Sequence, residues 1–154
     1  MAKKVLVVED DSAISTILHD NLIKAGYVAQ VAKNGKEGVE QALKTHPDII
    51  LLDLKMPVMD GMTALGLIRK DEWGKYVPVI VLTNISADTE EMVESMVTYK
   101  PQYYLIKSDW DIKDIITKVG EEIKFAEERL AAREKSKGKI MKDSNTDKEE
   151  ENVA

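Results

Sequence analysis

Four short apolar runs in this chain are each followed by side chains that could take part in metal or phosphate chemistry. In chain order these side chains are Glu9, Asp10 and Asp11, then Asp53, Thr83 and Lys107. One polar residue after an apolar run indicates nothing about function. Two groups of acids, a hydroxyl and an amine, each at the end of a different run, together form a possible site. Two carboxylates about 4 Å apart repel by roughly 4 kcal/mol at an effective dielectric constant near 20. Such a cluster therefore needs a cation or a proton.

The residue types favour magnesium as that cation. Ligation by oxygen alone, with room for water, fits Mg²⁺ better than Zn²⁺, which prefers histidine or cysteine. The chain has no cysteine, so a thiolate site, a disulfide and a cysteine nucleophile are all excluded. His19 and His46 are interpreted as surface or helix-packing residues.

A phosphoryl group would match the remaining side chains. The ammonium of Lys107 can neutralise one phosphoryl oxygen, and the hydroxyl of Thr83 can donate a hydrogen bond to another. Asp53 could be the nucleophile, and it needs no general base because a carboxylate is ionised at neutral pH. Taken singly, Lys107 could instead form a salt bridge to the acids, and Thr83 could be an ordinary strand residue.

These side chains can meet only if the apolar runs are neighbouring strands. Short, continuous apolar runs are typical of parallel strands buried on both faces, here Val5–Val8, Ile49–Leu52, Val77–Leu82 and Tyr103–Ile106. Residues Tyr27–Ala32 alternate in polarity, which predicts an edge strand. Helices between the strands give a (βα)5 doubly wound sheet in three layers, whose ligands bind beyond the carboxyl ends of the strands.

The intervening segments carry apolar stripes with helical spacing. We expect Gly26 to end the first helix, Asp88 and Glu91 to cap the fourth, and Ser108 to cap the fifth with Asp111 in its first turn. The predicted buried stripes, helix by helix, are Ile14, Ile17, Leu18 and Leu22; Val39, Ala42 and Leu43; Met62, Leu65 and Ile68; Met92, Val93, Met96 and Val97; and Ile112, Ile115, Ile116, Val119 and Ile123.

The length of 154 residues predicts one domain with an appendage. From Phe125 onward the chain is highly charged and poor in large apolar residues. We expect a domain over residues 1–124 and a helical extension over 125–154 that frays after Gly138 and becomes disordered. Ala126 and Leu130 continue the stripe of the last helix, which allows a monomer or a weak dimer.

Charge and hydropathy narrow the class further. With 22 Lys and Arg against 28 Asp and Glu, the net charge is −6, which argues against nucleic-acid binding. The longest apolar runs have about six residues, far fewer than the roughly 20 needed to span a bilayer. The acids at positions 9 to 11 come too early for a signal peptide. We expect a cytoplasmic protein without membrane insertion.

The segment Asp53–Gly61, with the sequence DLKMPVMDG, resembles the phosphoacceptor loop of the response-regulator receiver family, D-x-x-M-P-x-M-D-G. The acid pair, Thr83 and Lys107 also fall where that family places them, and the resemblance covers residues 3 to about 124. It implies a flavodoxin-like fold with strand order 2-1-3-4-5.

The resemblance also implies roles for single residues. Asp53 would be the phosphorylated aspartate. Asp10 and Asp53 would bind Mg²⁺ directly, the backbone carbonyl of Lys55 would add a further oxygen, and Glu9 would act largely through water. The phosphate-binding lysine would be Lys107, the switch hydroxyl Thr83 and the switch aromatic Tyr104.

Two loop residues and three departures complete the comparison with the family. Pro57 would fix φ before the turn, and Gly61 would allow a positive φ where the next helix begins. The chain has Ser108 where receivers usually have proline, Asn84 where they have a very small residue, and Tyr99–Gln102 where they have a stretch of small residues. The first two departures bear on the site, and the third on the choice of partner.

The sequence therefore favours a stand-alone phosphorylation switch in two-component signalling, not a turnover enzyme. A sensor histidine kinase or phosphotransfer protein would phosphorylate Asp53. Thr83 and Tyr104 would then change the surface of the fourth helix, fifth strand and fifth helix, where a target protein binds.

Three alternatives remain. A pseudo-receiver scaffold would keep the fold without phosphorylation. A Mg²⁺-dependent phosphohydrolase with an aspartyl nucleophile usually has a second aspartate two residues later, where this chain has Lys55. Flavin or nucleotide binding lacks a glycine-rich phosphate loop.

Overall fold

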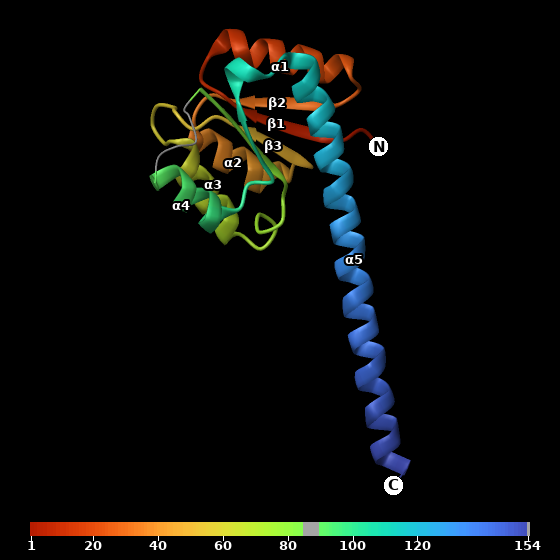
Figure 1. Ribbon diagram of the computed structural model, residues 1–154. Helices are drawn as coiled ribbons and strands as arrows, with labels where there is room; N and C mark the ends of the chain where they lie inside the picture. Colours follow the sequence, from red (N-terminus) through yellow and green to blue (C-terminus); the bar gives the residue numbers. More distant parts are fainter. Residues whose placement is uncertain (85–89, 154) are drawn as a thin grey trace. The chain divides into compact units, whose positions relative to one another are not determined.

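The computed structural model describes residues 1–84 and 90–153, and within them strands and helices alternate along the chain (Figure 1). Side chains are described up to residue 139, apart from those at positions 91, 92 and 95. The elements are β1 (Lys4–Val8), α1 (Ser12–Lys24), β2 (Val28–Ala32), α2 (Gly35–Thr45), β3 (Ile49–Leu52), α3 (Gly61–Lys70), β4 (Val79–Thr83), α4 (Glu90–Tyr99), β5 (Tyr103–Ile106), the 3₁₀ turn η1 (Lys107–Asp109) and α5 (Ile112–Val153).

The strands form one parallel sheet in the order β2-β1-β3-β4-β5, which confirms the predicted fold class. Val5–Val8 and Ile49–Leu52 are fully buried because each central strand has a neighbour on both sides and helices over both faces. The alternating segment is the edge strand β2, as predicted. β4 begins at Val79, two residues later than expected, after Pro78, which has no N–H to donate to a ladder.

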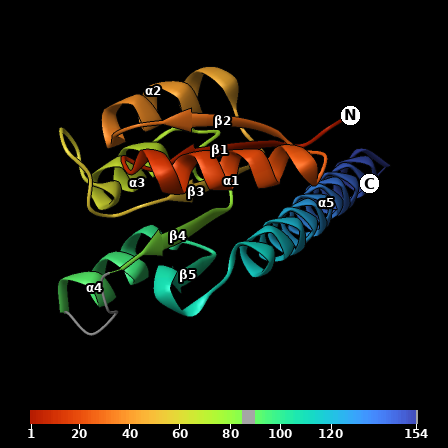
Figure 2. The same ribbon diagram turned by 90° about the horizontal axis from the view of Figure 1, so that it is seen from above.

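The core has two halves, one on each face of the sheet. In Figure 1, α1 lies above the sheet and α2, α3 and α4 lie below it. The lower half packs side chains of α2 and α3 against the sheet, with Tyr99 of α4 at its border. The upper half packs Leu18 and Leu22 of α1 and Ile115 and Val119 of α5 against the other face. Figure 2 shows the same arrangement from above.

Helices at the border of the sheet bury less than the sequence predicted. Ile17 and Leu43 are 47% and 37% exposed, and on α4 the side chains of Val93 and Val97 are 53% and 70% exposed. The side chain of Met92 lies outside the described ones. β5 is also an edge strand, and of its four residues only Leu105 is buried. The prediction that these residues are buried was wrong because an edge strand has a neighbour on one side only, which leaves part of the covering helix in solvent.

The helix ends follow local rules, with one exception to the prediction. Gly26 has φ 96° and follows the C-cap of α1, as expected. α5 is capped by Asp111, whose Oδ1 accepts the N–H of Asp114 at 2.9 Å, and not by Ser108, which lies in η1. The N-cap is the residue that directly precedes the helix, and α5 begins at Ile112, so Asp111 holds that position and Ser108 does not. The predicted cap at Asp88 lies outside the described residues.

The chain divides into two compact units, Met1–Ile123 and Lys124–Ala154. Helix α5 continues through Gly138, after which we expected it to fray. A single glycine costs a helix about 1 kcal/mol relative to alanine, which need not end a segment rich in Lys and Glu. Disorder of the last residues stays a prediction. No helix in the described part of the chain is long and apolar enough to cross a membrane.

Candidate phosphoacceptor and metal site

Three acids follow β1, and each has a different environment. The backbone N–H of Glu9 donates to Ala32 at 3.0 Å, which extends the β1–β2 ladder and turns the Glu9 side chain inward, where it is 2% exposed. Asp10 is exposed. Asp11 caps α1, accepting the N–H groups of Ala13 at 2.9 Å and Ile14 at 3.1 Å, so its carboxylate is committed to the helix as expected.

Asp53 follows β3 and is held by its own loop. Its backbone N–H donates to Val8 at 3.0 Å, and its Oδ1 accepts the N–H of Leu54 at 2.8 Å. Gly61 returns close to this point, donating its N–H to Leu54 at 2.9 Å, and a Cβ on Gly61 would collide with the Asp53 carbonyl. The need for glycine is therefore close approach and not the predicted positive φ. The positive φ in this loop belongs to Val58, at 69°.

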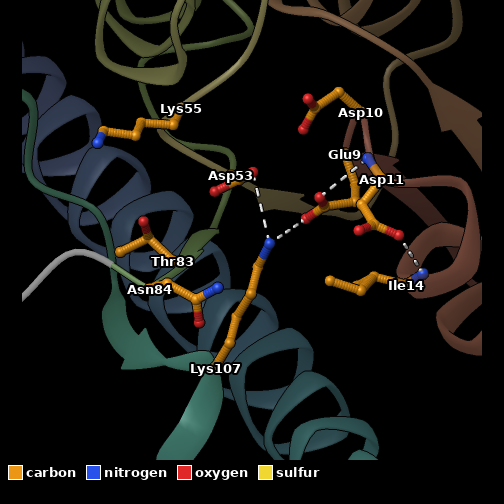
Figure 3. Close-up of a pocket in the computed structure, with 9 residues that line it drawn as sticks. All are labelled: Glu9, Asp10, Asp11, Ile14, Asp53, Lys55, Thr83, Asn84 and Lys107. Atoms are coloured by element: carbon orange, nitrogen blue, oxygen red, sulfur yellow. Dashed lines mark hydrogen bonds and ion pairs between the residues drawn. The ribbon is translucent and has the colours of Figure 1, made fainter.

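Lys107 follows β5 and reaches both buried acids. Its Nζ lies 2.6 Å from Oε2 of Glu9 and 3.4 Å from Oδ2 of Asp53 (Figure 3). η1 gives this reach although Ser108 stands at the position that usually carries proline. Thr83 at the end of β4 is 1% exposed and lines the same pocket. The salt bridge to the acids, which the sequence offered as an alternative role for Lys107, is present together with the proximity to Asp53.

The pocket has a volume of about 240 Å³ at the carboxyl edge of the sheet. Its lining residues, drawn in Figure 3, are Glu9, Asp10, Asp11, Ile14, Asp53, Lys55, Thr83, Asn84 and Lys107. The structure thus brings together the predicted acids, hydroxyl and amine. Ile14 was predicted only as a core residue. Its position in the first turn of α1, three residues after Asp11, could have indicated that it also lines the pocket. Tyr104 does not line the pocket and packs half-buried against the lower core.

The electrostatics of the pocket suit a divalent cation. Carboxylate oxygens of Glu9, Asp10 and Asp53 all lie within 4.8 Å of one another. Burial raises the pKa of both Glu9 and Asp53, although the nearby Lys107 ammonium acts in the opposite direction. One lysine therefore does not fully compensate these acids. An all-oxygen donor set with uncompensated negative charge is what Mg²⁺ binds in proteins, so the residues fit that ion.

The fold and pocket define a flavodoxin-like α/β domain with an acidic site at the ends of its strands, and comparisons with known proteins give the family. The response regulator receiver domain model matches residues 5–120. The chain therefore belongs to the response regulator receiver family, whose members act in two-component signalling.

Two curated relatives share this domain. A protein-glutamate methylesterase/protein-glutamine glutaminase of Archaeoglobus fulgidus is 43% identical over 95 residues, covering 60% of this chain and 26% of the relative. The DNA-binding dual master transcriptional regulator RpaA of Synechocystis is 31% identical over 116 residues, covering 75% of this chain and 47% of the relative. The chain thus spans less than half the length of either protein.

A solved structure supports the interpretation of the acidic cluster. The receiver domain of the sensor histidine kinase PA1611 from Pseudomonas aeruginosa is 28% identical, with a TM-score of 0.71, and the match covers 80% of this chain and 98% of that one. That structure has a magnesium ion coordinated in its active site cleft. Magnesium binding at an acidic pocket is thus found in this family, and this chain has an acidic cluster, Glu9, Asp10 and Asp53, in its pocket.

Proposed function

We propose that this chain is a phosphorylation-activated switch whose phosphoacceptor is Asp53. The observation that carries the proposal is the position of Lys107 Nζ, 3.4 Å from Asp53 Oδ2, at the edge of a pocket with three clustered carboxylates. An ammonium and a cation site on either side of one buried carboxylate can hold a phosphoryl group on it.

The phosphoryl donor is a phosphohistidine of a sensor histidine kinase or of a phosphotransfer protein. An Asp53 oxygen attacks phosphorus, the new P–O bond forms as the P–N bond breaks, and the imidazole leaves. Oδ1 is held by Leu54 N–H at 2.8 Å, which leaves Oδ2 toward Lys107 as the attacking atom. Lys107 then neutralises a phosphoryl oxygen, and the Thr83 hydroxyl donates to another.

Mg²⁺ would be held by Asp10, Asp53 and the backbone carbonyl of Lys55, with Glu9 acting through water. When bound there, the ion would supply positive charge to the phosphoryl oxygens. Glu9 also has a second role in this chain, because its 2.6 Å contact holds Lys107 inside the pocket before phosphorylation.

The output is a changed protein-binding surface. Thr83 moves toward the phosphoryl group, Tyr104 takes up the space that is freed, and the face formed by α4, β5 and α5 changes. Val93, Val97 and Tyr103 leave apolar area on this face, being 53%, 70% and 37% exposed. A target protein that covers these side chains is the partner that fits, and nucleic acid is not.

Phosphorylation by a small phosphodonor tests this proposal. With Mg²⁺, one phosphoryl mass should be added to the wild type and to the Asp20→Asn control, and none to Asp53→Asn. Asp20 is an exposed acid of α1 outside the pocket. Mass spectrometry of the intact protein reads the result. Labelling of Asp53→Asn, or none of the wild type with a donor or any competent kinase, would contradict the proposal and favour a scaffold without phosphorylation.

A turnover assay distinguishes the switch from a phosphohydrolase. A hydrolase needs an acid or base beside the leaving group, and the second residue after Asp53 is the exposed Lys55. We therefore expect no more than one phosphate ester consumed per protein molecule before the aspartyl phosphate decays. Repeated rapid turnover would show an enzyme.

A further inference from the structure

Arg69, in the last turn of α3, uses its whole guanidinium group on oxygens of three other segments. Nε donates to the carbonyl of Tyr99 at 2.9 Å, and Nη1 donates to the carbonyls of Gly74 at 2.8 Å and Val77 at 2.7 Å. Nη2 donates to the Lys100 carbonyl and the Gln102 side-chain oxygen, both at 3.3 Å. A guanidinium has five N–H groups, so five donors meet five acceptors.

None of these five acceptors is a carboxylate. Burial lowers the pKa of Arg69 to about 10, which still leaves the group charged at neutral pH. The carbonyls of Tyr99 and Lys100 belong to the C-terminal end of α4, where a helix has unpaired carbonyls and a partial negative charge. Arg69 thus caps α4 from another helix.

Two more contacts fix the same end of α4. The ring of Tyr99 lies against Gly66 of α3, where a Cβ would be 3.1 Å from the ring carbons. The Gln102 side chain accepts the N–H of Val79 at 2.7 Å, and the Gln102 N–H donates to the Val79 carbonyl at 2.9 Å. The end of α4 is therefore tied to both α3 and the beginning of β4.

The opposite end of α4 is the end nearer the phosphoacceptor pocket. β4 runs from Val79 to Thr83, and α4 returns from Glu90 to Tyr99, so the tied end lies at the edge of the sheet away from Thr83. Figure 1 shows α4 beside α3 below the sheet. At ten residues, α4 is about 15 Å long, so a rotation of about 10° about one end moves the other by roughly 2 to 3 Å.

We infer that Arg69 is a positioning residue that makes the Tyr99–Lys100 end of α4 a fixed pivot, so that a change begun at Thr83 displaces the Glu90 end. This inference rests on the proposed phosphorylation switch. On the face formed by α4, β5 and α5, the first turns of α4 then change with phosphorylation, and the last turn of α4 stays constant.

Nuclear magnetic resonance of the full chain, with and without Mg²⁺ and beryllofluoride as the phosphoryl mimic, tests the pivot. In the wild type, the mimic should shift the backbone amides of Glu90 and Val93 at least threefold more than those of Tyr99, Lys100 and Gln102. Arg69→Lys keeps the charge but has three donors in place of five. We expect it to raise amide hydrogen exchange at Tyr99, Lys100 and Gln102 at least tenfold and to spread the shifts to those residues.

Gly66→Ala gives a second variant, because Arg69→Ala would remove the group that satisfies five acceptors and could unfold the protein. The added methyl must push against the Tyr99 ring and should have the same effects as Arg69→Lys. Arg129→Lys and Gly138→Ala are the matched controls, since Arg129 is exposed and a Cβ at Gly138 meets nothing within 4 Å. Neither control should change amide exchange at Tyr99, Lys100 or Gln102.

Equal shifts at both ends of α4 in the wild type, or wild-type exchange in Arg69→Lys and Gly66→Ala, would overturn the pivot. Failure of the proposed function looks different, because no amide would then respond to the mimic in any variant. In that case the exchange rates without the mimic still decide whether Arg69 holds the end of α4, and equal rates would overturn the inference.

Discussion

At the residue scale, the acids of the pocket lower the stability of the ligand-free protein. Glu9 and Asp53 are buried acids 2% and 6% exposed, both close to one lysine. Removing water from two carboxylates costs more than one ammonium returns, which is why burial raises the pKa of each. Sites that bind charged ligands commonly carry such a cost in the ligand-free protein.

Asp53→Asn should therefore stabilise the protein in the absence of metal. The amide can still accept the Leu54 N–H and removes one buried charge, so we expect a gain of about 1 to 2 kcal/mol in the free energy of unfolding at pH 7. A carboxyl whose pKa is raised in the folded state contributes most stability below its unfolded pKa and loses that contribution as pH rises through its folded pKa. The gain should thus shrink as pH falls from 7 toward the ordinary range of carboxyl pKa values. Urea unfolding at several pH values measures it, and a loss of stability at pH 7 would contradict the expectation.

Mg²⁺ should stabilise the wild type more than it stabilises Asp53→Asn. A ligand present at 100 times its dissociation constant adds about 2.7 kcal/mol to a protein that binds it only when folded. Thermal unfolding with and without Mg²⁺ gives both values. An equal shift of the two proteins would place the ion elsewhere.

Lys107→Met should bind Mg²⁺ more tightly than the wild type. Lys107 Nζ lies 2.6 Å from a carboxylate oxygen of Glu9 and 3.4 Å from one of Asp53. It therefore competes with a metal ion for the same carboxylates. Removing the repulsion between the ammonium charge and the metal ion should tighten Mg²⁺ binding about tenfold, which corresponds to about 1.4 kcal/mol. Titration calorimetry measures the affinity, with Lys118→Met as control because Lys118 also pairs with two acids, Glu121 and Glu122, on α5. Unchanged or weaker binding would mean that Lys107 does not compete.

At the scale of elements, the loop between β3 and α3 carries local strain. Val58 has φ 69°, in the left-handed region that is unfavourable for a β-branched residue. Its side chain is 79% exposed, so packing contacts do little to offset this strain. The residues around it are fixed by close contacts, since Met59 accepts the N–H of Gly35 at 3.0 Å and Gly61 approaches Asp53.

Val58→Asn should relieve that strain. Asparagine tolerates the left-handed region far better than valine, and little burial is lost at so exposed a position, so we expect about 1 kcal/mol of added stability. Val28→Asn is the comparison, because Val28 is also exposed, at 45%, but lies in the extended backbone of β2. Chemical unfolding should show a gain for the first variant and a loss for the second, and a loss for both would contradict the strain.

At the scale of the whole molecule, the described contacts divide the chain near residue 124. The core side chains of α5 end at Ile123, and beyond it Phe125 and Leu130 are 45% and 48% exposed. We propose the receiver domain to be residues 1–124, with residues 125–154 as an extension that it does not need for folding.

A chain ending at residue 124 should fold with the stability and Mg²⁺ affinity of the full chain, within about 0.5 kcal/mol, since the core side chains of α5 end at Ile123. Circular dichroism with urea unfolding and calorimetry test this, and sedimentation at increasing concentration compares self-association of the two lengths. A large loss of stability would show that the extension belongs to the domain. Association of the full chain alone would assign the weak dimer to the extension.

The sequence by itself determined the alternation of strands and helices along the chain, the parallel sheet and the acids, hydroxyl and amine at the pocket, although not the place of Ile14 in its lining. Apolar runs such as Ile49–Leu52 are buried on both faces, and their ends must share one edge, so Asp53, Thr83 and Lys107 were predictable from residue type and position. Only the tertiary structure decided which of these groups touch, for instance that Lys107 is closer to Glu9 than to Asp53. It also decided that Val93 and Val97 face solvent, because a stripe cannot show how far a sheet extends beneath it. The same holds for Arg69, since most of its acceptors are backbone carbonyls, and every residue type has one, so no pattern of side chains reveals them.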